Sequence, residues 1–160
     1  MFRSAKAEEV KCVFSLVEKR VHWMDETGIR QWNVTNYLEA YPPAYYKEQQ
    51  VAGRLYVLAS PEITGAVVLL EEDDRWIDRA EEPAYYVHNL ATDPNVKGAG
   101  REILKAIEQL ALEQKKRYVR LDCATDNIFL NSYYSELGYQ LAGTCEEGLY
   151  KGNRREKKIG

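Results

Sequence analysis

The segment between Leu90 and Leu104 constrains this chain most, because it joins an alternating pattern to a helical one through Gly98 and Gly100. Residues 85–92 alternate like a strand, and apolar residues then recur at helical spacing (Ile103, Leu104, Ile107, Leu110 and Ala111). Glycine lacks a Cβ atom, and the first N–H groups of a helix are unpaired and carry the positive end of its dipole. The segment therefore predicts an anion cradle suited to a phosphate, with an ordinary turn as the alternative.

The next strand pattern helps to narrow the kind of phosphate site. Residues 119–123 alternate like a strand that lines a core, so the glycines lie in a strand, helix, strand unit. Ile103 stands where a dinucleotide fingerprint has its third glycine, and no Gly-Lys-Ser/Thr follows for a Walker loop. Asp122 lies at about the distance that a ribose ligand requires. A nucleotide site is therefore less favoured than another kind of phosphate site, but it is not excluded.

A second motif follows between Asp126 and Tyr139. It contains Asn127, then Tyr134 directly after the aromatic Tyr133, and Gly138 at the position of a helix C-cap. The two motifs, in this order, resemble the GNAT superfamily of acyl-CoA-dependent N-acetyltransferases over residues 55–151. Asn95 departs from the Gln or Arg usual at its position, and the link from Leu90 to the glycines looks shorter than in many members.

The N-terminal part adds a second likeness to this superfamily. The run Gly28-Ile-Arg-Gln31-Trp32, followed by Tyr41-Pro42, is similar to a bacterial subgroup of it. The resemblance implies a mixed α/β fold, a three-layer α/β/α sandwich with a mostly antiparallel central sheet. It also implies acetyl-CoA as co-substrate, no metal, and transfer of acetyl to a primary amine in a ternary complex.

The resemblance and the cradle together assign the cofactor site. We expect mainly backbone contacts, with the amides of residues 96–101 facing the pyrophosphate and residues 90–92 pairing with pantetheine. The predicted cofactor-binding residues are Leu90, Ala91, Thr92, Asn95, Val96, Lys97, Gly98, Ala99, Gly100, Arg101 and Asn127. For Asn127 the alternative is a helix N-cap without a binding role.

Acyl transfer to an amine needs a base for the ammonium proton and gains from an acid for the departing thiolate. Tyr134 occupies the motif's tyrosine position and is the predicted acid, with a core aromatic as the alternative. Strand alternation from Tyr85 to Ala91 places Tyr86, His88 and Leu90 on one face. His88 is the predicted base, and a hydrogen-bonded structural histidine is the alternative.

The acceptor is not identified by any residue pattern. Gln31, Trp32 and Tyr86 are the predicted substrate-binding residues, although Trp32 is also explained by packing alone. Aromatic faces suit a cation or an apolar side chain. Polyamines, amino acids, an antibiotic and a protein N-terminus all remain open as acceptors, as does a homodimer.

Composition fits one folded domain over residues 1–160, with 45% apolar and 29% charged residues. The net charge of −3 argues against a nucleic-acid partner, and no apolar run could span a membrane, so we expect a cytoplasmic protein. Cys12, Cys123 and Cys145 are interpreted as reduced core residues. The last residues of the sequence, 152–160, are rich in Lys and Arg and are interpreted as a solvated tail.

The acidic stretch of residues 71–82 is interpreted as a surface loop, with attraction of cationic amines as the alternative. We expect helices over residues 10–27 and 43–52 and a hairpin of residues 55–59 and 64–71. A closing pair, residues 140–145 and 149–151, should turn at Glu147-Gly148.

Two further functions stay open on these patterns. One is a non-catalytic module that binds acyl-CoA. The other is a nucleotide or nucleic-acid binder that uses the glycines and the basic end of the chain.

Overall fold

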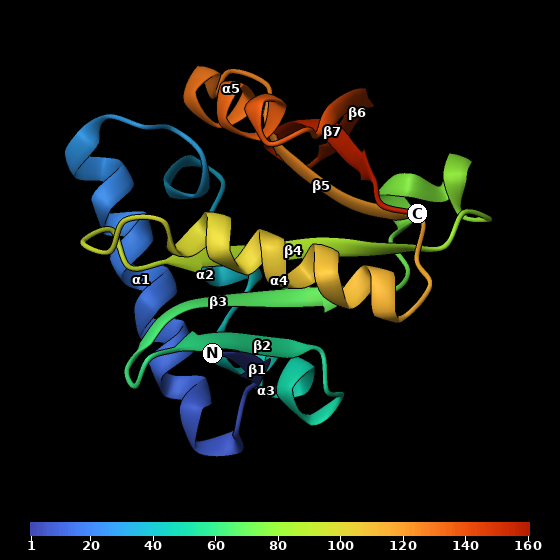
Figure 1. Ribbon diagram of the computed structural model, residues 1–160. Coiled ribbons are helices and arrows are strands. Elements are labelled where there is room, and N and C mark those ends of the chain that lie inside the picture. Colours follow the sequence, from blue (N-terminus) through green and yellow to red (C-terminus); the bar gives the residue numbers. More distant parts are fainter. The chain divides into compact units, whose positions relative to one another are not determined.

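A computed structural model describes all of residues 1–160 (Figure 1). The contacts within the chain divide it into two compact units. Unit 1 comprises residues 1–69 and 88–106, and unit 2 comprises residues 70–87 and 107–160. Strand β4 (Ala84–Thr92) and helix α4 (Ala99–Glu113) contribute to both. The seven strands follow the order β1-β2-β3-β4-β5-β7-β6, and the pairing is mostly antiparallel. The predicted mixed α/β class with such a sheet is confirmed.

Unit 1 contains three antiparallel strands, β1 (Phe2–Ser4), β2 (Leu55–Ala59) and β3 (Ile63–Leu70). Val57 of β2 stands opposite both Arg3 of β1 and Ala66 of β3. The predicted hairpin is therefore confirmed. The helical elements of this unit are η1 (Ala7–Glu9), α1 (Val10–Thr27), η2 (Trp32–Val34), α2 (Tyr37–Ala40) and α3 (Pro43–Val51).

Helix α1 follows directly from its sequence. Its buried residues recur at helical spacing (Val10, Val13, Leu16, Val17 and Met24) and form one apolar face. Gly28, with φ +76°, ends the helix in the left-handed conformation that glycine adopts without steric cost. The predicted helix and its C-terminus are both confirmed.

An aromatic ladder holds the short helices α2 and α3 in place. Trp32 stacks on Tyr37 with ring centroids 4.2 Å apart, and Tyr37 lies 4.7 Å from Tyr41. Tyr45 continues the series, 4.9 Å from Tyr41 and 5.1 Å from the fully buried Tyr46. Such pairs stabilise by about 0.5–1.5 kcal/mol each beyond the area they bury. Aromatic packing therefore supplies a core for a segment with few aliphatic residues.

Unit 2 contains η3 (Asp74–Arg79), β5 (Tyr118–Ala124), α5 (Ile128–Glu136), β6 (Gln140–Glu147) and β7 (Tyr150–Lys158). Strand β7 lies between β5 and β6 and is antiparallel to both. The core of this unit gathers around the buried Trp76, which packs with Ala84, Tyr86 and Ala142. The predicted helix that ends at Gly138 and the predicted closing strand pair are confirmed.

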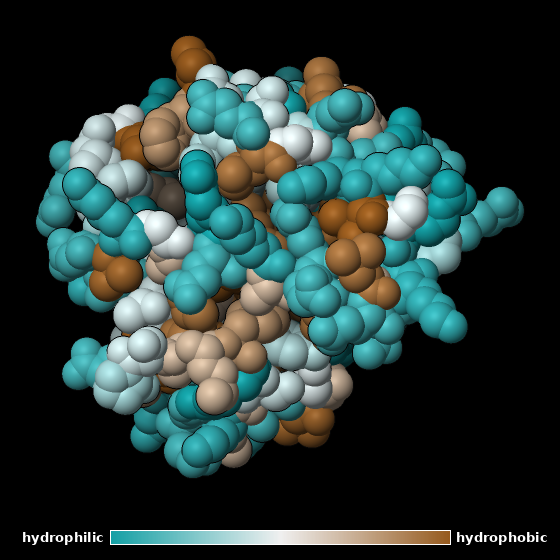
Figure 2. All heavy atoms as spheres, viewed as in Figure 1, coloured by the Kyte–Doolittle hydropathy of each residue, from teal (hydrophilic) through white to brown (hydrophobic).

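The surface in Figure 2 is mostly hydrophilic, and its apolar patches are separate, one of them lying over α5. Ile128 and Phe129, in the first turn of α5, are 81% and 67% exposed. No helix has the length and apolar character to cross a membrane. All three cysteines are free thiols. Cys123 is buried, but the prediction that Cys12 is a core residue is wrong, because Cys12 is on the exposed side of α1.

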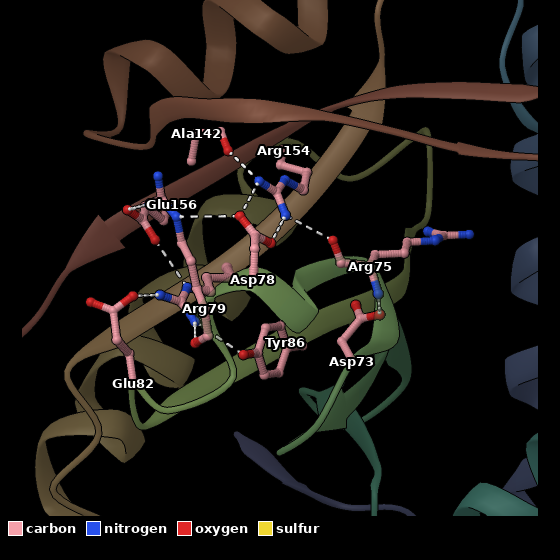
Figure 3. Close-up of polar contacts among 10 residues, drawn as sticks. Asp73, Arg75, Asp78, Arg79, Glu82, Tyr86, Ala142, Arg154 and Glu156 are labelled. Atoms are coloured by element: carbon pink, nitrogen blue, oxygen red, sulfur yellow. Dashed lines mark hydrogen bonds and ion pairs between the residues drawn. The ribbon is translucent and has the colours of Figure 1, made fainter.

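The prediction of a solvated basic tail is also wrong, because residues 152–158 belong to the inner strand β7. Arg154 is 8% exposed and donates to both carboxylate oxygens of Asp78, at 2.6 and 3.0 Å, and to Ala142 O at 2.8 Å (Figure 3). Its guanidinium carbon also lies 4.6 Å from the Trp76 ring centroid. Ion pairing and cation–π contact thus offset the cost of burying the charge.

The acidic stretch supplies the partners of these cations. Asp78 pairs with Arg154, and Glu82 accepts from Arg120 at 2.5 Å. Arg120 is fully buried, and its guanidinium carbon lies 4.9 Å from the Trp76 centroid. Much of the negative charge that suggested attraction of cationic amines is therefore neutralised within unit 2.

Candidate active site

Strand β4, which carries several predicted site residues, has an unusual backbone conformation at Asn89. Asn89 has φ +54°, a left-handed conformation that asparagine tolerates better than most residues. Its side chain is buried, accepts from Tyr45 Oη at 2.8 Å and donates to Tyr37 Oη. The burial of β4 nevertheless alternates through this position, since His88 and Leu90 are partly buried on either side of the buried Asn89, as the predicted strand alternation expects.

The bend between β4 and α4 has the geometry of an open helix start. Gly98 has φ +83°, and a Cβ atom built there would meet no other atom within 4 Å. The N–H of Glu102 donates to Gly98 O at 3.0 Å, which is the first intrahelical bond of α4. The N–H groups of residues 98–101 precede this bond and have no intrahelical acceptor. The backbone here thus presents clustered donors at the positive end of a helix.

Most side chains of the bend face solvent. Asn95, Lys97, Gly98 and Arg101 are exposed, Val96 is 39% exposed, and Ala99 is buried under the first turn of α4. Leu90, Thr92 and Gly100 are partly buried, and Ala91 is buried. An approach of a ligand to the main chain of residues 95–98 is therefore not blocked by their own side chains.

The parallel ladder between β4 and β5 is short. It pairs Ala84 with Tyr118 and ends with Tyr86 opposite Arg120, while β4 continues to Thr92. Tyr86 is 3% exposed and its hydroxyl accepts from Arg120 at 3.0 Å, so both its ring and its oxygen are engaged in the core of unit 2.

Tyr134 and Asn127 lie in unit 2, on and before α5. Asn127 is the N-cap of α5, because its Oδ1 accepts from Leu130 N at 3.0 Å. Tyr134 is 8% exposed, and its ring packs edge-on against Tyr133 and Tyr139, with centroids 5.4 and 6.1 Å away. Both expected structural alternatives, a helix cap and a packed aromatic, are thus present in the geometry.

Residues 21–139 match the model of the Acetyltransferase (GNAT) family, which covers more than half of the chain. The chain belongs to this GNAT family. It is an acetyl-CoA-dependent N-acetyltransferase. Its acceptor is a separate question that the match does not answer.

One curated relative and two solved structures similar to this GNAT chain are also named acetyltransferases. The "Uncharacterized N-acetyltransferase YesJ" of Bacillus subtilis (strain 168) is 27% identical over 151 residues, covering 89% of this chain and 83% of that protein. A GNAT family acetyltransferase from Listeria monocytogenes 4b F2365 superposes with a TM-score of 0.81 at 21% identity, covering 99% of this chain and 94% of that one. The PaiA N-acetyltransferase of Thermoplasma acidophilum, solved in complex with coenzyme A, gives 0.75 at 16% identity, with coverage of 99% and 98%. The two structures show a shared fold.

The predicted site residues of this GNAT chain divide between the units. Unit 1 holds the bend, His88, the buried Gln31 and the stacked Trp32, whereas unit 2 holds Tyr134 and Asn127. No group of His, Cys, Asp and Glu side chains in residues 1–160 has an arrangement that could hold a metal ion. Sequence reasoning missed Asn89, and a lone asparagine in a strand pattern carries no signal of a left-handed backbone.

Proposed function

We propose that this enzyme transfers the acetyl group of acetyl-CoA to a primary amine by direct attack in a ternary complex. The bend at Gly98 would bind the diphosphate of the coenzyme. The observation that carries the proposal is the open, left-handed Gly98 at the start of α4, where the N–H groups of residues 98–101 have no intrahelical acceptor.

The main chain of this region offers candidates for contact with the rest of coenzyme A. Peptide groups of Leu90 and Ala91 lie on β4 beyond the end of its ladder with β5, and they are candidates to pair with the pantetheine amides. Thr92 is a weaker candidate than the sequence suggested, because its carbonyl already accepts from Arg20 Nε at 3.1 Å. The exposed Asn95, Lys97 and Arg101 would border the phosphates.

In the proposed reaction, the acceptor nitrogen attacks the thioester carbonyl carbon, and the carbon–sulfur bond breaks. His88 takes the proton that the ammonium group must lose, directly or through water. Tyr134 donates a proton to the sulfur of the departing thiolate, and a phenol is suited to this because it keeps its proton at neutral pH. Gln31 and Trp32 would contact the acceptor, and Asn127 would contact pantetheine or an ordered water.

Binding of coenzyme A is tested by substituting Gly98 beside a matched control. Gly98 and Gly53 have φ values of +83° and +76°, and a Cβ at either meets nothing within 4 Å. Gly98→Val and Gly53→Val should therefore carry similar backbone strain, about 1–2 kcal/mol. Only Gly98→Val should raise the Kd for coenzyme A, by about tenfold or more, in isothermal titration calorimetry. Equal affinity in the two variants would refute the cradle.

Catalysis is tested with a panel of amines and acetyl-CoA, following thiol release. Tyr134→Phe should lower the rate by roughly 10²–10⁴ while the Kd for coenzyme A stays unchanged. Tyr133→Phe, one residue away on the same helix, is the control and should keep its rate. Thiol release that is unaffected by Tyr134→Phe would remove this residue from the mechanism. Coenzyme binding without turnover of any amine would instead favour a binding module.

A further inference from the structure

Asp93 links the end of β4 to the bend through three backbone-directed hydrogen bonds. Its N–H donates to Thr64 O of β3 at 2.8 Å, and its carbonyl accepts from Val96 N at 3.0 Å. Its carboxylate Oδ1 accepts from Asn95 N at 2.9 Å. The residue therefore fixes the turn from which the chain enters the bend at Gly98.

Two adjacent cations of α1 hold the same short segment. Lys19 Nζ lies 2.9 Å from Asp93 Oδ1. Arg20 donates through Nε to Thr92 O at 3.1 Å and through a terminal nitrogen to Thr92 Oγ1 at 2.7 Å. The guanidinium of Arg20 is itself held 4.6 Å above the ring of Trp23. Lys19 and Arg20, which are consecutive in α1, thus contact Asp93 and Thr92, which are consecutive where β4 ends.

The charge of Asp93 makes this arrangement informative. Its pKa is lowered, first by the hydrogen bond from Asn95 N and then by Lys19, so the group is ionised at neutral pH. An anionic side chain a few residues before a diphosphate site should repel the ligand. Its presence there is explained if the shape that it gives to the turn outweighs this repulsion.

We propose that Asp93, held by Lys19, and Thr92, held by Arg20, preset the shape of the loop over residues 93–98, so that coenzyme A binds a preformed cradle. The three charged side chains are positioning residues and need not touch the coenzyme. A preformed loop avoids the ordering cost that a mobile loop would add to binding. The inference rests on the proposed function, since it assumes that the bend binds the diphosphate.

The direction in which Asp93→Ala changes the Kd for coenzyme A distinguishes a positioning role of Asp93 from a purely electrostatic one. Loss of a negative charge alone should lower the Kd for coenzyme A, whereas loss of the preset turn should raise it, roughly fivefold to tenfold. Asp93→Asn also removes the charge and the ion pair but keeps an oxygen acceptor for Asn95 N, so its Kd should lie below that of Asp93→Ala if the turn matters. Lys11→Met, which removes an exposed cation from the same helix, is the control and should leave the Kd unchanged.

A double variant and a conservative replacement complete the test. Lys19→Met should add little to the effect of Asp93→Ala, because both break one linkage. Arg20→Met should raise the Kd, and Arg20→Lys should restore part of the affinity by donating to one of the two Thr92 oxygens. Thermal unfolding without ligand is measured in parallel. Lower melting temperatures with an unchanged or lower Kd would overturn positioning. Absence of coenzyme binding by the wild type would overturn the proposed function and this inference together.

Discussion

Replacement of Arg120 by methionine should unfold unit 2 much more readily, because this side chain is fully buried and bonded on every side. It donates to Glu156 Oε1 at 2.9 Å, to Arg79 O at 3.1 Å, to Tyr86 Oη at 3.0 Å and to Glu82 Oε1 at 2.5 Å. Methionine has a similar length and is apolar, so the substitution removes the charge and the donors while leaving little cavity. The polar groups left behind determine the cost.

The magnitude follows from how well each partner can be satisfied otherwise. Removing one member of a buried ion pair costs about 3–5 kcal/mol. Glu156 keeps its contact with Arg79 at 2.5 Å, and the Glu82 side chain is 34% exposed and can be hydrated. The buried Tyr86 hydroxyl loses its donor, which costs about 1–3 kcal/mol. We therefore expect a loss near the lower limit, about 3 kcal/mol, or roughly 6–12 °C in melting temperature.

The matched control is Arg3→Met. Arg3 also donates twice to one carboxylate, that of Glu9, at 2.8 Å each, but it is 29% exposed, and such surface pairs contribute about 0–1 kcal/mol. Urea unfolding, followed by tryptophan fluorescence and circular dichroism, measures both variants. If Arg120→Met costs no more than Arg3→Met, burial does not determine the strength of these contacts and the reasoning fails.

Two further predictions concern titration and thiol reactivity. The pKa of Asp78 is lowered to about 2, chiefly by the hydrogen bond from Arg154, so the stability that the ionised group contributes is present above its ordinary pKa and lost as pH falls toward 2. The difference in urea stability between wild type and Asp78→Asn should therefore be largest near pH 6 and disappear between about pH 4 and pH 2, and a difference that stays constant would contradict this. Burial raises the pKa of Cys123 to about 12 and of Cys145 to about 11, so a thiol reagent at pH 8 should label only the exposed Cys12 quickly in the native protein, and rapid labelling of all three would contradict the burial.

The parts of the fold that the sequence predicted are those with local causes. Helix α1 and its stop at Gly28 follow from an apolar face and a residue that accepts φ +76°. The hairpin of β2 and β3 follows from two β-rich runs and one turn. The bend at Gly98 and the start of α4 just after it follow in the same way, from a strand pattern, two glycines and a helical pattern.

The errors of the sequence analysis come from pairing between distant segments. The basic end and the acidic stretch are both plain in the sequence, and each taken alone predicts a solvated surface. Arg154 and Asp78 are 76 residues apart, and their bidentate contact exists only because β7 is inserted between β5 and β6. Strand order depends on the whole sheet, and no window of sequence contains it.

Asn89 and Asp93 show why parts of the candidate site escaped prediction. Each is a small polar residue in or next to a strand pattern, and composition gives no reason to single it out. The structure shows what distinguishes them, since Asn89 is held by the hydroxyls of Tyr37 and Tyr45, and Asp93 by Lys19. Tyr37 lies on α2, Tyr45 on α3 and Lys19 on α1, all far from β4 in the sequence. The N-terminal helical segment therefore holds both Asn89 within β4 and the entry to the bend, and its substitution should affect coenzyme binding as well as acceptor binding.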